Sequence, residues 1–508
     1  MSVPQNQLGQ FLYEAGWLPI GEPIGFPAVG DLLPSIQQAW AFFDLESLPA
    51  NARRRAKIMQ FWLNEQITNG AQLTSLSTES GRATHWLGER FLWWPHGRLT
   101  GSLIGVASSR LGRRLDTQTD WFTVFRAAYS KIDRDQDVLL TAAATTPDRY
   151  VRRAAELFGV RVVSMICPRE SEPIQTWFKR IRQLEAMPRE AIHQVYVSPE
   201  LSSAADDSAN HVYLANLPLR DRAVVSLAER LLVFHLRHDG HLEMLVGARL
   251  DDPVWPTASV FIALGEDLVD REIADDLLDR GAVGWVVLDT LRHEAARRCA
   301  RPTSQRAPII KLPSSESWQW LTHCTRAQSD GWPDQRQIDY LDELLLNCDA
   351  SDHSAFAAVQ RIIATQRLVA TSRMIRGDTD VVCFTAVPLR DLPQLRSFRS
   401  HLTRWDFEPY GICIRHDWLA RRRCLPVRYG DDSLWNSLAA EDRPLFQVRT
   451  TRSRRRSIDW SIEREWRHVG DVDLAELPTE AGLIFVPTRE EAEQLATISR
   501  WPVTILGS

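Results

Sequence analysis

Three acidic residues lie close together near the C-terminus, within residues 457–468 (SIDWSIEREWRH). If this stretch is a strand, every second side chain points to the same face, so Asp459, Glu463 and Glu465 share one side. A helix would also align several apolar residues at i,i+4, but it would leave Trp460 outside the apolar stripe. We therefore predict a strand that presents carboxylates to a cleft. The alternative is an ordinary amphipathic strand with a solvated face.

An arginine-rich stretch precedes this predicted strand. Residues 449–456 hold five arginines in eight positions. Such a run is typical of a solvated loop, but beside a carboxylate site it could contact an acidic target such as nucleic acid. The residues predicted to form this target loop are Arg452, Arg454, Arg455 and Arg456.

Composition restricts the class of protein. The chain has 508 residues, 44% of them hydrophobic, with a net charge of -5, which argues against a wholly nucleic-acid-coating or membrane-coating role. Its seven cysteines show no C-x-x-C spacing, which indicates reduced thiols. We find neither a signal peptide nor an apolar run of about 20 residues. The sequence therefore predicts a cytoplasmic protein with no membrane partner.

The first 98 residues mix short helical patterns with aromatic residues, and an α/β pattern begins at residue 99. Buried strands are predicted at 102–110, 137–141 and 160–164, separated by amphipathic helices. This rhythm predicts a Rossmann-like parallel sheet over 99–205, with helices on both faces. Ligands of such sheets bind beyond the carboxyl ends of the strands. The polar residues expected there are Ser108, Ser109, Arg110, Thr145 and Thr146.

Two motifs in this region resemble those of a known superfamily. The sequences GVASSR and LLTAAATTPDRYVRRAAELFG resemble the first and second loops of SLOG domains, which are Rossmann-like nucleotide-binding domains. The resemblance covers about residues 100–170 and implies a nucleotide ligand at the loops named above. The second loop lacks the glycine of that family. In the alternative interpretation, the loops are plain α/β turns whose serine and threonine residues are helix N-caps.

A further α/β segment is predicted at 206–301, either as an extension of the first sheet or as a second copy. Residues 235–244 read as a hairpin around an Asp-Gly turn. The hairpin would carry His235, His238 and His241, but no cysteine or second carboxylate cluster supports them, so we predict no metal site. Three prolines and few apolar residues at 302–313 indicate a linker.

The segment 314–508 is predicted to be an α+β domain. Its motifs occur in the order LTHCTR, RIIATQRLVA, CFTAVPL, YGICI, PVRY and EREWR. This order resembles the ADP-ribosyltransferase fold, and within it the DarT-like and AbiGi-type abortive-infection proteins. The resemblance covers about residues 315–508 and implies that NAD is the substrate. It assigns the catalytic carboxylate to Glu465, with Glu463 as its upstream partner.

The same resemblance implies residues that hold NAD. His323 corresponds to the first-strand histidine of the family, with Thr325 and Arg326 adjacent. Tyr410 is the candidate ring that stacks on nicotinamide, and two other rings compete for this role. The competing rings are Phe384 and Tyr429.

Together these patterns predict an NAD-consuming ADP-ribosyltransferase-like effector coupled to a Rossmann-like, nucleotide-sensing region in antiphage defence. The transfer target would be a nucleic acid or a protein. An alternative is a catalytically inactive binding or antitoxin-like module on the same scaffold. A nuclease that uses Asp459, Glu463 and Glu465 on a metal ranks last, because no lysine follows at the E-x-K spacing.

Overall fold

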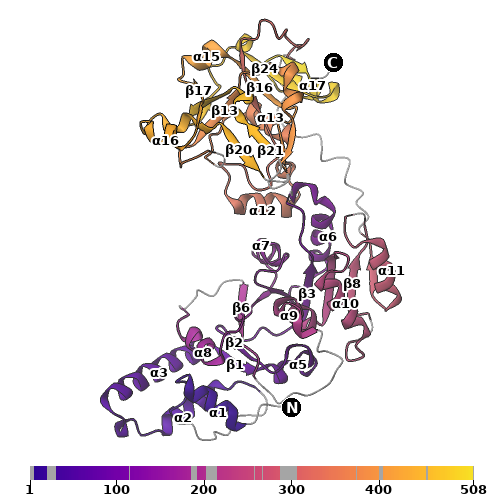
Figure 1. Cartoon of the computed structure of the whole chain (residues 1–508). Helices are drawn as coiled ribbons and strands as arrows, with labels where there is room; N and C mark the ends of the chain where they lie inside the picture. Colours follow the sequence, from indigo (N-terminus) through magenta and orange to yellow (C-terminus); the bar gives the residue numbers. More distant parts are fainter. Residues whose placement is uncertain are drawn as a thin grey trace. The chain divides into compact units, whose positions relative to one another are not determined.

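The computed structural model divides the chain into two compact units. The first comprises residues 1–112 and 118–289, and the second comprises 113–117 and 290–508 (Figure 1). The first unit takes in the segment 1–98, all of 99–205 except residues 113–117, and most of 206–301. The structure describes residues 5–19, 30–113, 115–184, 192–201, 214–256, 258–265, 267–286, 306–372, 375–399, 404–453 and 456–506.

A nine-stranded sheet forms the centre of the first unit. Its strands are β1 (Gln72–Ser75), β2 (Phe91–Trp94), β3 (Ser102–Ser108), β4 (Asp137–Ala142), β5 (Val162–Ile166), β6 (Ile192–Val197), β7 (Arg230–His235), β8 (Val260–Ala263) and β9 (Val283–Trp285). They lie in the order β1-β2-β6-β5-β4-β3-β7-β8-β9. Strands β3 to β9 are all parallel, whereas β1 and β2 add antiparallel pairs at one edge. The predicted parallel α/β sheet is confirmed.

Helices cover both faces of this sheet. They are α1 (Gln5–Glu14), α2 (Leu33–Phe42), α3 (Ala50–Thr68), α4 (Leu76–Glu79), α5 (Gly81–Leu87), α6 (Thr119–Tyr129), α7 (Asp148–Phe158), α8 (Ile174–Arg182), α9 (Leu219–Leu227), α10 (His241–Asp251) and α11 (Arg271–Asp279). On β7, Val233 belongs to the core beneath α5, α9 and α10, while the next residue, Phe234, contacts Trp121 of α6. Adjacent residues of a strand point to opposite faces, so α6 lies on the other side.

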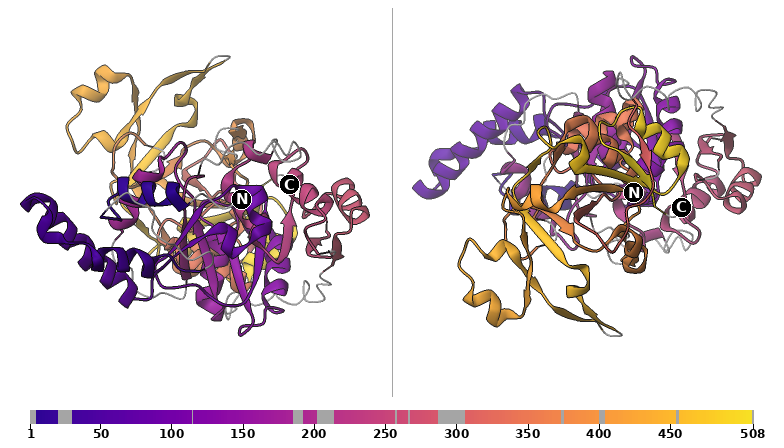
Figure 2. Two further views of the ribbon diagram at one scale, coloured as in Figure 1. Left: turned by 90° about the horizontal axis from the view of Figure 1, so that it is seen from below. Right: turned by 90° about the horizontal axis from the view of Figure 1, so that it is seen from above.

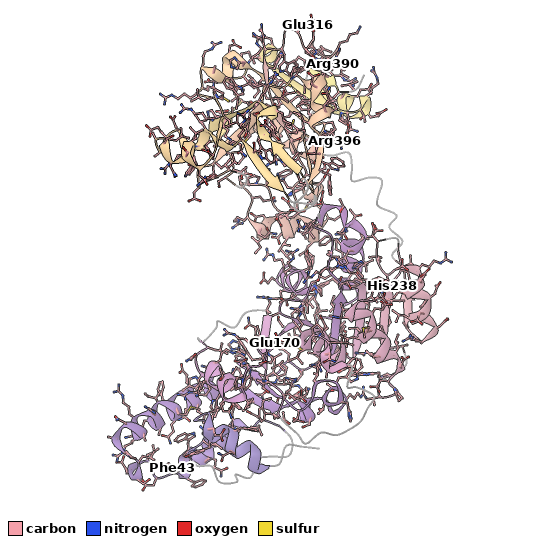
Figure 3. The ribbon with its side chains drawn as sticks, viewed as in Figure 1. Phe43, Glu170, His238, Glu316, Arg390 and Arg396 are labelled. Atoms are coloured by element: carbon pink, nitrogen blue, oxygen red, sulfur yellow. The ribbon has the colours of Figure 1, made fainter. Side chains whose placement is uncertain are left out.

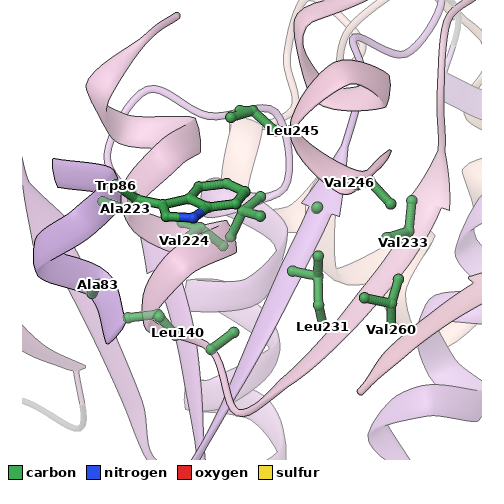
Figure 4. Close-up of a cluster of buried hydrophobic side chains, with 14 of the residues drawn as sticks. Ala83, Trp86, Leu140, Ala223, Val224, Leu231, Val233, Leu245, Val246 and Val260 are labelled. Atoms are coloured by element: carbon green, nitrogen blue, oxygen red, sulfur yellow. The ribbon is translucent and has the colours of Figure 1, made fainter. Parts of the chain in front are cut away.

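The core beneath α9 depends on a close approach between helix and sheet (Figure 4). A Cβ on Gly105 of β3 would lie 2.7 Å from the Cβ of Ala228 and 3.2 Å from Val224. A side chain at position 105 would therefore push α9 away from the sheet.

Aromatic residues fill a second core around α1, α2, α3 and α8. The ring of Trp17 lies 5.1 Å from that of Trp62 and 5.8 Å from that of Trp93, both nearly perpendicular to it. Such edge-to-face pairs are favourable aromatic contacts. The long helix α3 extends from one end of this unit (Figure 2).

The α/β segment predicted at 206–301 extends the first sheet through β7, β8 and β9. The predicted hairpin at 235–244 is wrong, because His235 ends β7 and His241 begins α10. Asp239, with φ of 56°, and Gly240 turn the chain from strand into helix instead. His238 lies exposed at the surface (Figure 3). No group of three or more metal-binding side chains occurs among the described residues.

The second unit is built around an eight-stranded mixed sheet. Its strands lie in the order β10 (Ile309–Ile310), β25 (Val503–Ile505), β24 (Gly482–Val486), β16 (Gly411–Arg415), β11 (Trp320–Cys324), β13 (Val381–Thr385), β22 (Glu465–Val469) and β17 (Leu425–Pro426). Two-stranded ribbons accompany it: β12 (Arg367–Leu368) with β23 (Val472–Asp473), β14 (Ser397–Arg399) with β15 (Arg404–Asp406), β18 (Arg428–Gly430) with β19 (Phe446–Val448), and β20 (Thr450–Ser453) with β21 (Arg456–Asp459).

Two hydrophobic cores cover the two faces of this sheet. The first core contains Ile412 and Phe384. The second core, on the opposite face, contains Cys413 and Leu483. The helices of this unit are α12 (Gln337–Leu346), α13 (Ala355–Thr365), α14 (Leu392–Leu395), α15 (His416–Ala420), α16 (Asp432–Ser437) and α17 (Arg489–Ala496). Residues of α13, α15 and α17 belong to the first of these cores.

Two local predictions for this unit need correction. Residues 457–468 are not one strand: β21 ends at Asp459, a 3-10 turn covers Trp460–Glu463, and β22 begins at Glu465. The Asp459 side chain accepts a hydrogen bond from Ser461 N, and Arg464 adopts a left-handed conformation with φ of 44°, so the chain turns twice. Part of the predicted linker is strand β10, which pairs with β25.

Candidate functional site

Three neighbouring strands of the second unit, β11, β13 and β22, hold three of the predicted site residues, His323, Phe384 and Glu465. In the β-ladder, Thr322 of β11 lies opposite Thr385 of β13, which lies opposite Glu465 of β22. Directly paired residues project from the same face of a sheet. The three side chains therefore share one face at the end where β22 begins.

The Glu465 carboxylate is held by Arg467, two residues along the same strand. Arg467 Nε lies 2.8 Å from Glu465 Oε1 and Nη2 lies 3.1 Å from Oε2, a two-point ion pair. The Arg467 side chain is 2% exposed and also donates to the backbone oxygens of Pro444 and Phe446, each at 2.8 Å. Glu465 N donates to Tyr429 Oη at 2.8 Å. Glu465 is thus fixed in position, and its charge is balanced.

Glu463 lies in a different environment. It ends the 3-10 turn, and its backbone oxygen accepts a hydrogen bond from Thr385 Oγ1 at 2.5 Å. Burial raises the pKa of its carboxyl to about 7, and the nearby charges of Glu465 and Asp406 add to this effect. A carboxyl with this pKa is divided between its two protonation states near neutral pH, as acid–base catalysis requires.

Arginines supply the positive charge around Glu463. Arg399 and Arg326 both favour its ionised form, but they do not outweigh burial and the two acids. Arg399 Nε lies 2.6 Å from Asp406 Oδ2, and its guanidinium is 4.8 Å from the ring centre of Trp460. Glu463 is therefore flanked by two arginine–carboxylate pairs, with Arg326 as a further cation.

His323 lies on the opposite face of the sheet from Glu465. Its ring is 5.8 Å from that of Phe384, in a core that also holds Ile412. Burial lowers the pKa of His323 to about 4. The neutral ring can donate from Nδ1 to the Cys383 backbone oxygen at 2.9 Å. His323 and Phe384 are thus internal side chains that do not face the carboxylates.

The remaining predicted contacts to NAD are engaged within the fold. Thr325 Oγ1 donates to the Ala355 backbone oxygen at 2.8 Å, and Thr325 N donates to the Tyr410 oxygen at 2.9 Å. Tyr410 Oη donates to Glu491 Oε1 at 2.8 Å, and burial together with this carboxylate raises the pKa of the phenol. The structure therefore brings Glu463, Glu465 and Arg326 together. It places His323, Phe384 and Tyr410 by the core that contains Ile412, on the opposite face of the sheet.

Several residues of the cluster were missed in the sequence. Arg467 could have been found, because a residue two positions from Glu465 on a strand shares its face. Arg399 and Asp406 come from the β14–β15 ribbon, about 60 positions upstream, and no motif connects them to Glu463. Tyr429, predicted only as a competing ring, instead contacts the Glu465 backbone.

The arginine-rich stretch belongs to the β20–β21 ribbon. Thr450 pairs with Asp459 and Arg452 pairs with Ser457, so the stretch includes β20 and the start of β21. Arg456 begins β21, whereas Arg454 and Arg455 lie outside the described residues. The ribbon leads directly into the turn that ends at Glu463.

The predicted ligand residues of the first unit lie at the carboxyl ends of β3 and β4. From β3, the strands β4 to β6 follow on one side and β7 to β9 on the other. The position between β3 and β7 is therefore the topological switch point of the sheet. Ser109 N donates to the His235 oxygen, and Ser109 Oγ accepts a hydrogen bond from Arg237 N at 3.2 Å. Arg237 also donates to the Arg110 backbone oxygen at 2.9 Å. Ser109 and Arg110 therefore lie beyond the carboxyl ends of β3 and β7, the position at which sheets of this kind bind ligands.

Two hydroxyls in these loops are used internally. Ser108 Oγ accepts a hydrogen bond from Trp121 Nε1 at 3.0 Å, and Thr145 Oγ1 donates to the Ala142 oxygen at 2.7 Å. Thr146 is half-buried next to Thr145. These bonds stabilise the loops themselves.

Comparisons with known proteins return no relative: no family model, no curated protein and no solved structure matches the chain. Among the described helices, none is long and apolar enough to cross a membrane.

Proposed function

We propose that the second unit is an NAD-consuming, ADP-ribosyltransferase-like effector with Glu463 as its acid–base group. The observation that carries this proposal is the carboxyl of Glu463, whose pKa is raised to about 7 between two arginine–carboxylate pairs. The reaction class, cleavage of NAD, is inferred from the resemblance of the motif order in residues 315–508 to the ADP-ribosyltransferase fold.

The residues of this cluster suit the proposed chemistry. Cleavage of the bond between nicotinamide and ribose develops positive charge on the sugar, which nearby carboxylates stabilise. The Glu465 side chain, held in place by Arg467, is the carboxylate that we assign to stabilise this positive charge. Glu463 can accept the proton of the attacking nucleophile at neutral pH. Arg326 and Arg399 provide the cations that a diphosphate group requires.

His323 does not lie where the resemblance to the ADP-ribosyltransferase fold requires it. Its ring lies in the core on the opposite face from Glu465, so we assign NAD contacts to Arg326 and Arg399 in place of His323, Phe384 and Tyr410. Thr325 then acts as a support that joins β11 to α13.

The test is release of nicotinamide from NAD by the purified full-length chain. Glu463→Gln keeps the shape of the side chain but cannot take up a proton, so we expect a loss of about 100-fold or more. Glu476→Gln, in which an exposed carboxylate is changed, is the matched control. Equal activity of the Glu463 variant and the wild type would refute the assignment.

One observation favours the second candidate function, a binding or antitoxin-like module without turnover. The Glu465 carboxylate is occupied by Arg467 at both oxygens, so it has less freedom to bind a ribose hydroxyl. Calorimetric titration with NAD separates the two functions. Saturable binding with no product would support this module over the enzyme.

We further propose that the switch-point crevice of the first unit binds a nucleotide and that the β20–β21 ribbon contacts an acidic target, in a cytoplasmic effector of antiphage defence. Neutralising Arg452 and Arg456 together with the neighbouring arginines should weaken modification of the target and spare NAD hydrolysis. Equal loss of both activities would contradict a targeting role.

A further inference from the structure

A cavity of about 690 Å³ lies in the first unit, at the amino ends of β3 and β7. Its lining includes Ser102 at the start of β3 and Arg230 at the start of β7, together with Arg82 of α5. The crevice proposed for a nucleotide lies beyond the carboxyl ends of the same strands, so the cavity is a separate site. Its volume is in the usual range for sites that hold a small molecule.

The floor of the cavity is apolar. It consists of side chains that are at least 97% buried and come from β2, β4, β5 and β6. These residues are Leu92, Leu140, Val163, Met165 and Val195. Because their side chains contain no hydrogen-bonding nitrogen or oxygen, the floor suits a hydrocarbon or aromatic body.

Most charges at the rim already have partners. Arg98 pairs with Glu79 at 2.9 Å, and Arg230 pairs with Asp137. Glu229 accepts a hydrogen bond from Ser102 at 2.8 Å. Arg82, by contrast, makes no ion pair with a carboxylate within the described ranges. One rim cation is therefore available to a ligand.

Trp255 connects Arg82 to a second, buried cation. The Arg82 guanidinium lies 6.0 Å from the Trp255 ring centre and that of Arg249 lies 4.3 Å from it. Arg249 is fully buried and donates to Ser259 Oγ and the Glu229 backbone oxygen at 3.2 Å, but in the described part of the chain it has no carboxylate partner. Two cations therefore lie over one aromatic ring, and neither pairs with a carboxylate among the described residues.

Trp255 forms part of the cavity wall, beside Arg82.

From these contacts we infer that the cavity binds an amphipathic monocarboxylate. Its apolar body lies on the floor, and its carboxylate lies at Arg82. A neutral molecule of the same shape would bury the same surface but would leave the Arg82 cation without an anion.

The test is isothermal titration of the full-length protein with octanoate, 1-naphthoate and octan-1-ol. We expect saturable binding of one or both carboxylates with a stoichiometry of one, and weaker binding of the alcohol. Preference for octanoate or for naphthoate distinguishes an aliphatic body from an aromatic one. The absence of saturable carboxylate binding would overturn the inference.

Arg82→Met should weaken carboxylate binding by about tenfold or more and leave binding of the alcohol unchanged. Arg271→Met, at a side chain that is 94% exposed on α11, is the control and should bind like the wild type. Leu99→Trp at the cavity wall should reduce the binding of all three probes. Unchanged carboxylate affinity in Arg82→Met, or equal loss of the alcohol, would contradict a carboxylate at Arg82.

Discussion

Glu463 and Glu465 are separated by one residue, yet their surroundings are different. Glu465 has an arginine at both carboxylate oxygens, whereas burial and the charges of Glu465 and Asp406 oppose the charge of Glu463. Arg464 accounts for this difference, because its left-handed conformation separates the end of the 3-10 turn from the start of β22. Alternation along a strand predicted that the pair share a face, and it did not anticipate this turn.

At the residue scale, Arg467→Lys should destabilise the second unit by roughly 3 kcal/mol, because an ammonium cannot replace the fork that joins Glu465, two carbonyls and Gln447. Urea unfolding measures this change. Arg421→Lys, at a side chain that is 73% exposed, should shift stability by no more than about 0.5 kcal/mol. Equal effects of the two substitutions would show that the Arg467 network contributes little.

A second prediction concerns pH. The pKa of Glu463 is raised in the folded state to about 7 from an ordinary 4.5, so the folded protein binds this proton more tightly than the unfolded chain. Its contribution to stability is complete below about pH 4.5 and is lost as the pH rises through about 7. Glu463→Gln should therefore gain stability relative to the wild type between pH 5 and pH 8.

Urea unfolding at the two pH values checks this difference, with Glu476→Gln as the control. A difference between Glu463→Gln and the wild type that does not change with pH would contradict the raised pKa.

At the scale of elements, the register of β11, β13 and β22 determines which residues can act together. Successive residues of a strand point to opposite faces of the sheet. One face therefore carries Thr322, Thr385 and Glu465, and the other carries His323, Phe384 and Trp466. The order of the motifs predicted that these strands exist. It could not predict the faces, because register depends on pairing between segments about 60 to 80 positions apart.

Gly411 provides a test of this register. A Cβ at position 411 would lie 2.1 Å from the His323 backbone oxygen, so Gly411→Ala would force β16 away from β11. We expect loss of cooperative unfolding in thermal scans. Gly470→Ala is the comparison, because that glycine has φ of +76° but no atom near its Cβ position, and it should cost only about 1–2 kcal/mol. Similar costs at both positions would contradict the observed contact of the strands.

The parallel sheet of the first unit was predictable because its strands are short apolar runs followed by turn residues. β3, β4 and β5 lie within or close to their predicted ranges. The Asp-Gly pair after β7 led to the wrong prediction of a hairpin, because Asp239 and Gly240 can also turn the chain from a strand into a helix. The cluster around Arg399 and the cavity near Trp255 could not be predicted, since both join segments with no shared motif.

At the scale of the whole molecule, the second unit has its own cores. Its hydrophobic clusters consist of residues between 309 and 506. We therefore expect a fragment of residues 306–508 to fold, with a cooperative unfolding transition by circular dichroism and the protease resistance of the full chain. A fragment that unfolds without cooperativity would show that its stability depends on residues outside this range.

The neighbouring positions of β10 and β25 have a consequence for protein engineering. Ile309 pairs with Val503 and Ile310 with Thr504, so the first and last strands of the second unit run side by side. A unit whose two ends meet can be joined by a short peptide and reopened elsewhere, or inserted into a surface loop of another protein, without unravelling its sheet. Such circular permutants would allow the Glu463 cluster to be studied as a transferable module.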